Sequence, residues 1–210
     1  MNVTIQDVEK FSNQLLNIQK PPVLWSDIRT DGNCFFHAID YAFTGKLLPK
    51  DSNKIILLRQ KIAKTMNADK ISGVSYKEFI GPTSPYVEID VIIATAKYYK
   101  KTIIVISINQ YGGVTMIRPK HVKLDPLFLI CHDMHYVPYH SKKVKISESL
   151  RNKLLQIEKN QISNGSIQDE NGVYVTSFLL KDMNGIKNSL SLTRKRLHKR
   201  NTNSNTKKII

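Results

Sequence analysis

One apolar segment constrains the fold of this chain more than any other feature. Residues 102–108 read Thr-Ile-Ile-Val-Ile-Ser-Ile, and a run of β-branched residues without polar alternation is typical of a strand that is buried on both faces. Such a strand needs a layer of other elements on each side. We therefore expect it to lie near the centre of a sheet.

The segments around this strand predict the remaining elements. Apolar residues at helical spacing precede it in three segments, at residues 34–44, 55–66 and 88–99. In the last of these, four side chains are expected to share one face, namely Ile89, Ile92, Ile93 and Ala96. Short strand-like runs follow it at residues 114–117, 127–131 and 136–139. The sequence thus predicts an α+β domain, with a small central β-sheet flanked by helices.

Breaks in this pattern predict the domain boundaries. An amphipathic helix is expected within residues 1–22, where two prolines end it. The folded domain is expected over residues 23–140, and a partly helical extension over residues 141–184, with its helix at residues 146–157. Residues 185–210 are basic, polar and low in complexity, so we expect this tail to be disordered.

The charge of the chain is concentrated in that tail. The whole chain has 32 Lys and Arg residues against 17 Asp and Glu, a net charge of +15. Residues 185–210 supply eight of these positive charges and contain no acidic residue. The tail is either a solvated, solubilising segment or a contact for nucleic acid or a nuclear-import receptor, and its sequence leaves these readings open.

Three further sequence features indicate where in a cell the protein is expected. No apolar run is long enough to span a membrane, and the first residues lack the basic and apolar pattern of a secretory signal. Two cysteines are too few for a disulfide scaffold. We therefore expect a soluble intracellular protein, cytoplasmic or nuclear, with no membrane contact. Nothing in the sequence demands a dimer, so we expect a monomer.

Residues 31–36 carry the pattern with the most chemical content. Gly32 allows a sharp turn, which would place Cys34 in the first turn of a helix. Unpaired backbone N–H groups and the helix dipole at that end favour an anion. A thiolate and a developing oxyanion are both anions, so this position suits a cysteine nucleophile. Such a nucleophile needs a base, which is usually a histidine from a distant strand.

The same segment carries a family resemblance. The run Asp-Gly-Asn-Cys-Phe-Phe at residues 31–36 resembles the nucleophile motif of the OTU (ovarian tumour) family of cysteine proteases, which are deubiquitinases. Three later segments resemble the rest of the family pattern in the same order, namely the start of the middle helix at residues 85–89, the strand at residues 102–108 and the His-Tyr pair at residues 135–136. The resemblance covers residues 23–140 and implies an OTU-like fold.

The resemblance also implies a mechanism. Cys34 would attack the carbonyl of the isopeptide bond between the ubiquitin C-terminal glycine and a lysine, and His135 would act as general base. Backbone N–H groups of residues 31–34 would hold the oxyanion. No metal or organic cofactor is implied, and the partner is ubiquitin or a ubiquitin-like modifier and its conjugates. Viruses and intracellular bacteria also carry domains of this kind, which leaves a host cell open as the place of action.

One position departs from the family pattern. Many members place Asp or Asn two residues after the catalytic histidine, where it orients the imidazole. This chain has Val137 there, which cannot form a side-chain hydrogen bond. We favour Asp31 as the third functional residue, either orienting His135 or shaping the oxyanion loop. Asp27 or Asp133 could serve instead, or the site could be a Cys-His dyad.

Simpler readings exist for each candidate residue. Cys34 could be a small buried hydrophobe, and Asp31 could merely cap the helix. His37 lies one turn after Cys34, and we expect it to pack on the helix or face solvent. The Cys and His residues within positions 131–135 suggest zinc, but strand alternation separates neighbouring side chains and a fourth ligand is not evident.

Three functions from different classes follow. The first is an active OTU-type deubiquitinase, with Cys34, His135 and Asp31 as its site residues. The second, motivated by Val137, is a catalytically weak or inactive OTU-like module that binds ubiquitin. The third is a nucleic-acid-associated protein that binds through its basic tail.

Overall fold

The computed structural model describes residues 28, 31–49, 53–66, 68, 70–81, 86–108, 113–139, 146–165, 168–169 and 172–179. The predicted N-terminal helix and the basic tail lie outside these residues. Within them, no helix combines the length and apolar character that crossing a lipid bilayer requires. The fold is mixed α+β, as the sequence predicts.

A six-stranded mixed sheet forms the middle of the molecule, in the order β6-β5-β3-β4-β8-β7. Its strands are β3 (Ile103–Ser107), β4 (Gly113–Pro119), β5 (Leu127–His132), β6 (His135–Pro138), β7 (Gln168–Asp169) and β8 (Val173–Leu179). β3 pairs in parallel with β5, and every other pairing is antiparallel. The predicted buried strand is thus an inner strand of the sheet, and the predicted run at 127–131 lies beside it.

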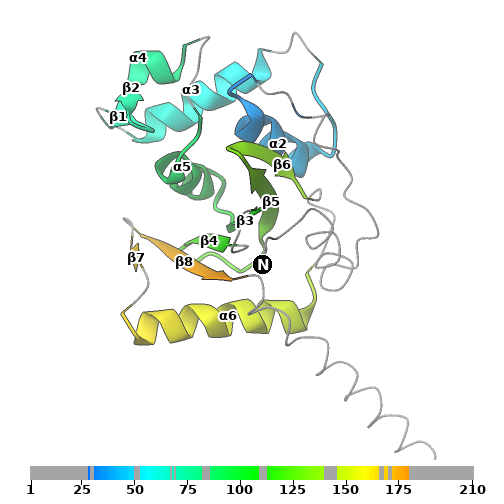
Figure 1. Ribbon diagram of the computed structural model, residues 1–210, viewed down its shortest axis with the longest axis vertical. Helices are drawn as coiled ribbons and strands as arrows, with labels where there is room; N and C mark the ends of the chain where they lie inside the picture. Colours follow the sequence, from blue (N-terminus) through cyan, green and yellow to red (C-terminus); the bar gives the residue numbers. More distant parts are fainter. Residues whose placement is uncertain are drawn as a thin grey trace, which may run out of the picture.

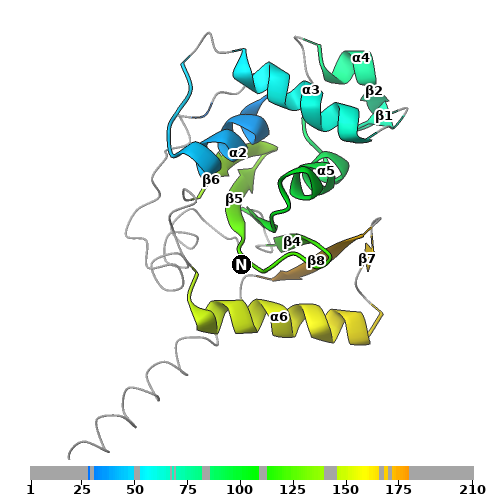
Figure 2. The ribbon, with the colours of Figure 1, turned by 180° about the vertical axis from the view of Figure 1, so that it is seen from behind.

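Helices cover both faces of this sheet. On one side lie α2 (Cys34–Thr44), α3 (Lys54–Met66) and α5 (Ile89–Tyr99), and on the other lies α6 (Glu148–Ser163) (Figure 1). The view from behind shows the same layers, with α2 against β6 (Figure 2). Along β3, Ile103 and Val105 face the first helical layer, whereas Ile104 and Ile106 face α6. A strand buried on both faces therefore explains the unbroken apolar run.

The bounds of α2, α3 and α5 agree with the sequence pattern, whereas α6 begins two residues later and ends six residues later than predicted, and one helical face differs. Gly45, in the left-handed conformation at φ 70°, ends α2 directly after the predicted segment 34–44. In α5, Val91, Ile92 and Thr95 are among the buried residues, whereas Ile89 is exposed. Ile89 is the first residue of α5 and is 45% exposed, so the predicted face is wrong at that residue.

The hairpin and short helix between α3 and α5, and the strand β8, are elements that the sequence pattern did not predict, whereas the helix α6 was expected. Between α3 and α5, a small hairpin of β1 (Lys70–Ile71) and β2 (Val74–Ser75) leads into the short helix α4 (Tyr76–Phe79). Beyond residue 140, α6 covers the sheet and β8 pairs with β4 over seven residues. The extension predicted over residues 141–184 therefore supplies a helix and a strand to the fold built around β3.

Candidate active site

Cys34 is the first residue of α2, where the loop of residues 31–33 turns sharply into the helix. Gly32 has φ of 78°, a conformation that a side chain would strain. The Asp31 carboxylate accepts a hydrogen bond from the Asn33 backbone N–H at 2.9 Å. Asn33 is the N-cap residue, and its side chain makes no capping bond. Asp31 therefore shapes the loop before the helix and does not cap α2.

The sulfur of Cys34 lies against the start of β6. Its Sγ donates to the Met134 carbonyl at 3.7 Å and accepts from the Tyr136 backbone N–H at 3.5 Å. These two residues flank His135, which is half-buried and is the first residue of β6. Two segments about a hundred residues apart in sequence thus meet at this sulfur.

The surroundings of the sulfur determine its charge state. Cys34 is only 3% exposed, and this burial raises the pKa of its thiol. Backbone N–H groups of Tyr136, Phe35 and Cys34 itself act in the opposite direction, because they stabilise a negative sulfur. The charge of Asp31 raises the pKa further. The resting group is therefore a thiol, which needs a base to become a nucleophile.

A tyrosine holds β6 against α2 beside the sulfur. The Tyr136 hydroxyl donates to the Val87 carbonyl at 3.2 Å, and its ring packs edge-to-face on Phe35 with centroids 5.3 Å apart. Burial raises the pKa of this hydroxyl, so it stays a neutral donor. These contacts fix the strand that carries the Tyr136 N–H.

The candidate third residues lie in different places. Asp31 Oδ2 is 3.5 Å from His37 Nε2, so the imidazole it faces is one turn along α2. Asp133 is highly exposed and lies 3.6 Å from His132 Nδ1. Val137 is buried in the core. Asp27 falls outside the described residues.

Arg59 is a residue of the site that the sequence analysis missed. It lies on α3, is 1% exposed, and donates to the Gly32 carbonyl at 2.9 Å and to Asn33 Oδ1 at 3.1 Å. It sits four residues after Ile55 and three before Ile62, on the apolar face of its helix. A charged residue on that face was the available signal, because buried arginines need partners.

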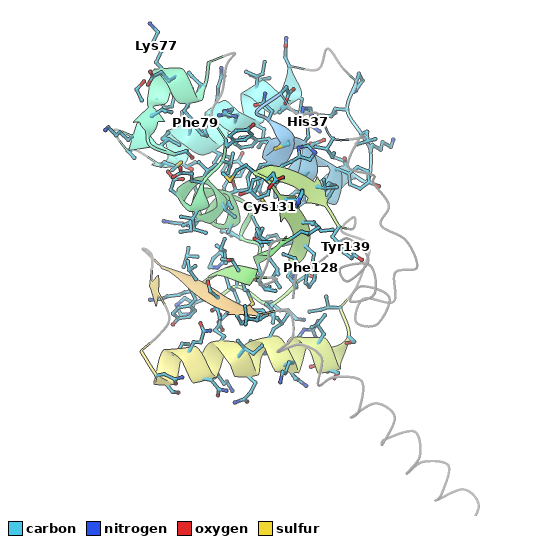
Figure 3. All side chains as sticks on the ribbon, in the orientation of Figure 1. His37, Lys77, Phe79, Phe128, Cys131 and Tyr139 are labelled. Atoms are coloured by element: carbon cyan, nitrogen blue, oxygen red, sulfur yellow. The ribbon has the colours of Figure 1, made fainter. Side chains whose placement is uncertain are left out.

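The second cysteine lies next to this site. Cys131, on β5, is directly opposite Tyr136 in the β5–β6 ladder and is half-buried (Figure 3). Burial raises the pKa of its thiol as well. Across the described parts of the chain, no three His, Cys, Asp or Glu side chains are grouped so that they could hold a metal ion.

The chain was compared with protein-family models and with curated proteins. The chain matches no protein-family model, and no curated protein matches it. Any assignment of function must therefore be argued from the residues around Cys34.

Proposed function

We propose that this protein is a cysteine-dependent deubiquitinase of the OTU type, with Cys34 as nucleophile and His135 as general base. The observation that carries the proposal is the position of the Cys34 sulfur, at the start of α2 and against the backbone on both sides of His135. A helix N-terminus and a histidine-bearing strand are the two parts that an activated cysteine requires.

The proposed reaction passes through a thioester. His135 takes the thiol proton, and the sulfur attacks the carbonyl carbon of the ubiquitin C-terminal glycine. The carbonyl oxygen becomes an oxyanion, which backbone N–H groups at the start of α2 stabilise. When the intermediate collapses, the C–N bond breaks and His135 returns the proton to the lysine amine. Water, deprotonated by His135, then hydrolyses the thioester and releases the glycine carboxylate.

The resting geometry requires one movement before attack. The sulfur belongs to a buried side chain and donates to the Met134 carbonyl of the β5–β6 turn. This turn consists of Asp133 and Met134, both with positive φ and both exposed. Because the turn carries little buried surface, the substrate can displace it at modest cost. The substrate tail would then lie where the turn contacts the sulfur.

Asp31 has a specific part in this proposal. Its carboxylate holds the Asn33 N–H and faces His37. These contacts favour the oxyanion-loop role over the role of orienting His135. A dyad of Cys34 and His135, supported by the loop, accounts for a site in which Val137 replaces the usual polar residue.

Hydrolysis of a ubiquitin C-terminal fluorogenic amide tests the proposal. We expect turnover by the wild-type chain and none by Cys34→Ala. Cys131→Ala is the matched control, since it removes the neighbouring thiol, and it should retain turnover. Full activity of Cys34→Ala would exclude this nucleophile, and an inactive wild-type chain would exclude the proposed activity.

Two observations favour a second function, a ubiquitin-binding module without turnover. Burial raises the pKa of the Cys34 thiol, and Val137 cannot orient His135. This alternative expects the wild-type chain to bind ubiquitin with an affinity that Cys34→Ala leaves unchanged, and to release no fluorophore from the amide. Turnover that depends on Cys34 would reject it.

A further inference from the structure

Arg59 occupies an unusual place for a charged residue. It projects from α3 into the first helical layer, where its guanidinium packs over the Phe79 ring at 4.1 Å and the Phe36 ring at 5.4 Å. Figure 3 shows Phe79 among the side chains between α4 and α3. Placing a cation at such a site carries a desolvation cost, which hydrogen bonds must offset.

The hydrogen bonds of Arg59 converge on the loop before the nucleophile. Its Nε donates to the Phe79 carbonyl at 2.6 Å, which fixes the guanidinium plane. One terminal nitrogen then reaches both the Gly32 carbonyl and Asn33 Oδ1. The Asn33 side chain, which would otherwise cap α2, is thereby turned toward α3. This leaves the start of α2 without a side-chain cap, as an oxyanion site requires.

The charge of Arg59 also reaches the sulfur. Burial lowers the pKa of Arg59 to about 10, and the anionic forms of Cys34 and Asp31 oppose that change. The guanidinium therefore stays protonated at neutral pH. Because Arg59 donates to the two residues directly before Cys34, its positive charge lies where it favours an anionic sulfur.

We infer that Arg59 is the positioning residue of this site: it holds the Gly32–Asn33 peptide so that Cys34 begins α2 against β6, and its cation stabilises the anionic sulfur. The inference rests on the proposed function, because it takes Cys34 as the nucleophile. Arg59 touches no reacting atom in this account and acts through the loop and through its charge.

The test measures the pH dependence of Cys34 alkylation by iodoacetamide in the full chain, with the modified peptide quantified by mass spectrometry. The titratable and charged groups on the elements near Cys34 are Asp31 on the loop, His37 on α2, Arg59 on α3, Cys131 on β5, and His135 and Tyr136 on β6. Substitution at Arg59 alone leaves the others in place. Lys61→Met, which removes an exposed charge from the same helix, is the matched control.

Two variants separate charge from geometry. Arg59→Gln removes the cation, and we expect the alkylation midpoint to rise by about one pH unit, which slows alkylation about tenfold at pH values below the midpoint. Arg59→Lys keeps the cation but cannot reproduce the planar set of donors, so we expect a smaller midpoint shift. Lys61→Met should leave the midpoint unchanged. Equal midpoints in wild type and a folded Arg59→Gln would overturn the electrostatic part of the inference.

Turnover of the ubiquitin amide by Arg59→Lys tests the positioning part. We expect kcat to fall about tenfold with KM nearly unchanged, because a misplaced nucleophile affects the chemical step. An unchanged kcat in Arg59→Lys would overturn the positioning role. This test does not depend on Arg59→Gln, so it still decides the role if that variant fails to fold. Alkylation uses no ubiquitin. A wild-type chain that is inactive on ubiquitin would therefore sink the proposed function, while the alkylation comparison still decides the charge effect of Arg59.

Discussion

The two sides of the sheet each carry an arginine, one half-buried and one buried, and the two residues are held in different ways. On the α6 side, Arg118 of β4 forms a bidentate pair with Glu158, which is buried. On the other side, the contacts of Arg59 described above are to two backbone carbonyls and an amide oxygen. The Glu158 carboxylate neutralises the positive charge of Arg118 where the two side chains meet. The guanidinium of Arg59 lies against the loop that leads into Cys34, the proposed nucleophile.

Under the proposed function, the α6 face serves stability and the opposite face carries the chemistry. The α6 face holds an apolar cluster, including Leu150 and Leu154, and the Arg118–Glu158 ion pair. The opposite face holds Cys34, His135 and the loop that Arg59 fixes. Substitutions on the first face should therefore change the free energy of unfolding, and substitutions on the second should change reactivity.

The largest expected effect on the chemical face comes from His135→Ala. Loss of the general base should lower turnover of the ubiquitin amide by about 10²–10⁴-fold, while circular dichroism shows an unchanged fold. His132→Ala is the matched control, because His132 lies directly opposite His135 in the ladder and is more exposed. Equal losses of turnover in both variants would mean that turnover depends on the β5–β6 pairing and not on the imidazole of His135.

The largest expected effect on the stabilising face comes from Glu158→Ala. Removing this carboxylate leaves the half-buried Arg118 without its charged partner, so the free energy of unfolding in urea should fall by about 1.5–3 kcal/mol. The double variant Arg118→Met with Glu158→Leu should recover most of that loss, since apolar groups of similar size replace the pair. The Cys34 alkylation midpoint should not move in either protein, and a clear shift would break the division between the faces.

Asp31→Asn has a smaller effect and separates two roles. The charge of Asp31 raises the pKa of Cys34, so its removal should lower that pKa and move the alkylation midpoint down by less than about one pH unit. Turnover should fall by no more than about tenfold if Asp31 only shapes the loop. A loss near 10⁴-fold would instead indicate that Asp31 orients the imidazole of the base.

The smallest expected effect is that of Ser75→Ala. Ser75 caps α4 in a reciprocal pair of bonds with Glu78, and its loss should lower stability by about 1 kcal/mol in urea unfolding. Lys77→Ala is the control, since that side chain points away from the molecule (Figure 3). A changed alkylation midpoint in Ser75→Ala would show that the Phe79 carbonyl depends on α4 to hold Arg59.

Local pattern predicts much of this fold. The β-branched run of β3, the apolar period of α3 and the glycine after α2 each depend on interactions along one segment. The role of β8 was not predictable in the same way, because its partner β4 lies more than fifty residues away and the pairing is decided by tertiary contacts.

The sequence predicted the positions of Cys34 and His135 on their helix and strand, but it did not predict the contacts around them. A motif placed Cys34 at a helix start, and a second short motif marked the strand that begins at His135. The orientation of Asp31 toward His37, and the reach of Arg59 to the loop, depend on how α2 and α3 cross. That crossing is set by side-chain packing, which no single segment of sequence encodes.

Reaction with ubiquitin that carries a C-terminal electrophile, followed by mass spectrometry, tests the central claim most directly. We predict one covalent adduct on Cys34, formed by wild type and Cys131→Ala, and strongly slowed in His135→Ala. An adduct on Cys131, or no adduct on a folded chain, would contradict the claim that Cys34 is the nucleophile of this protein.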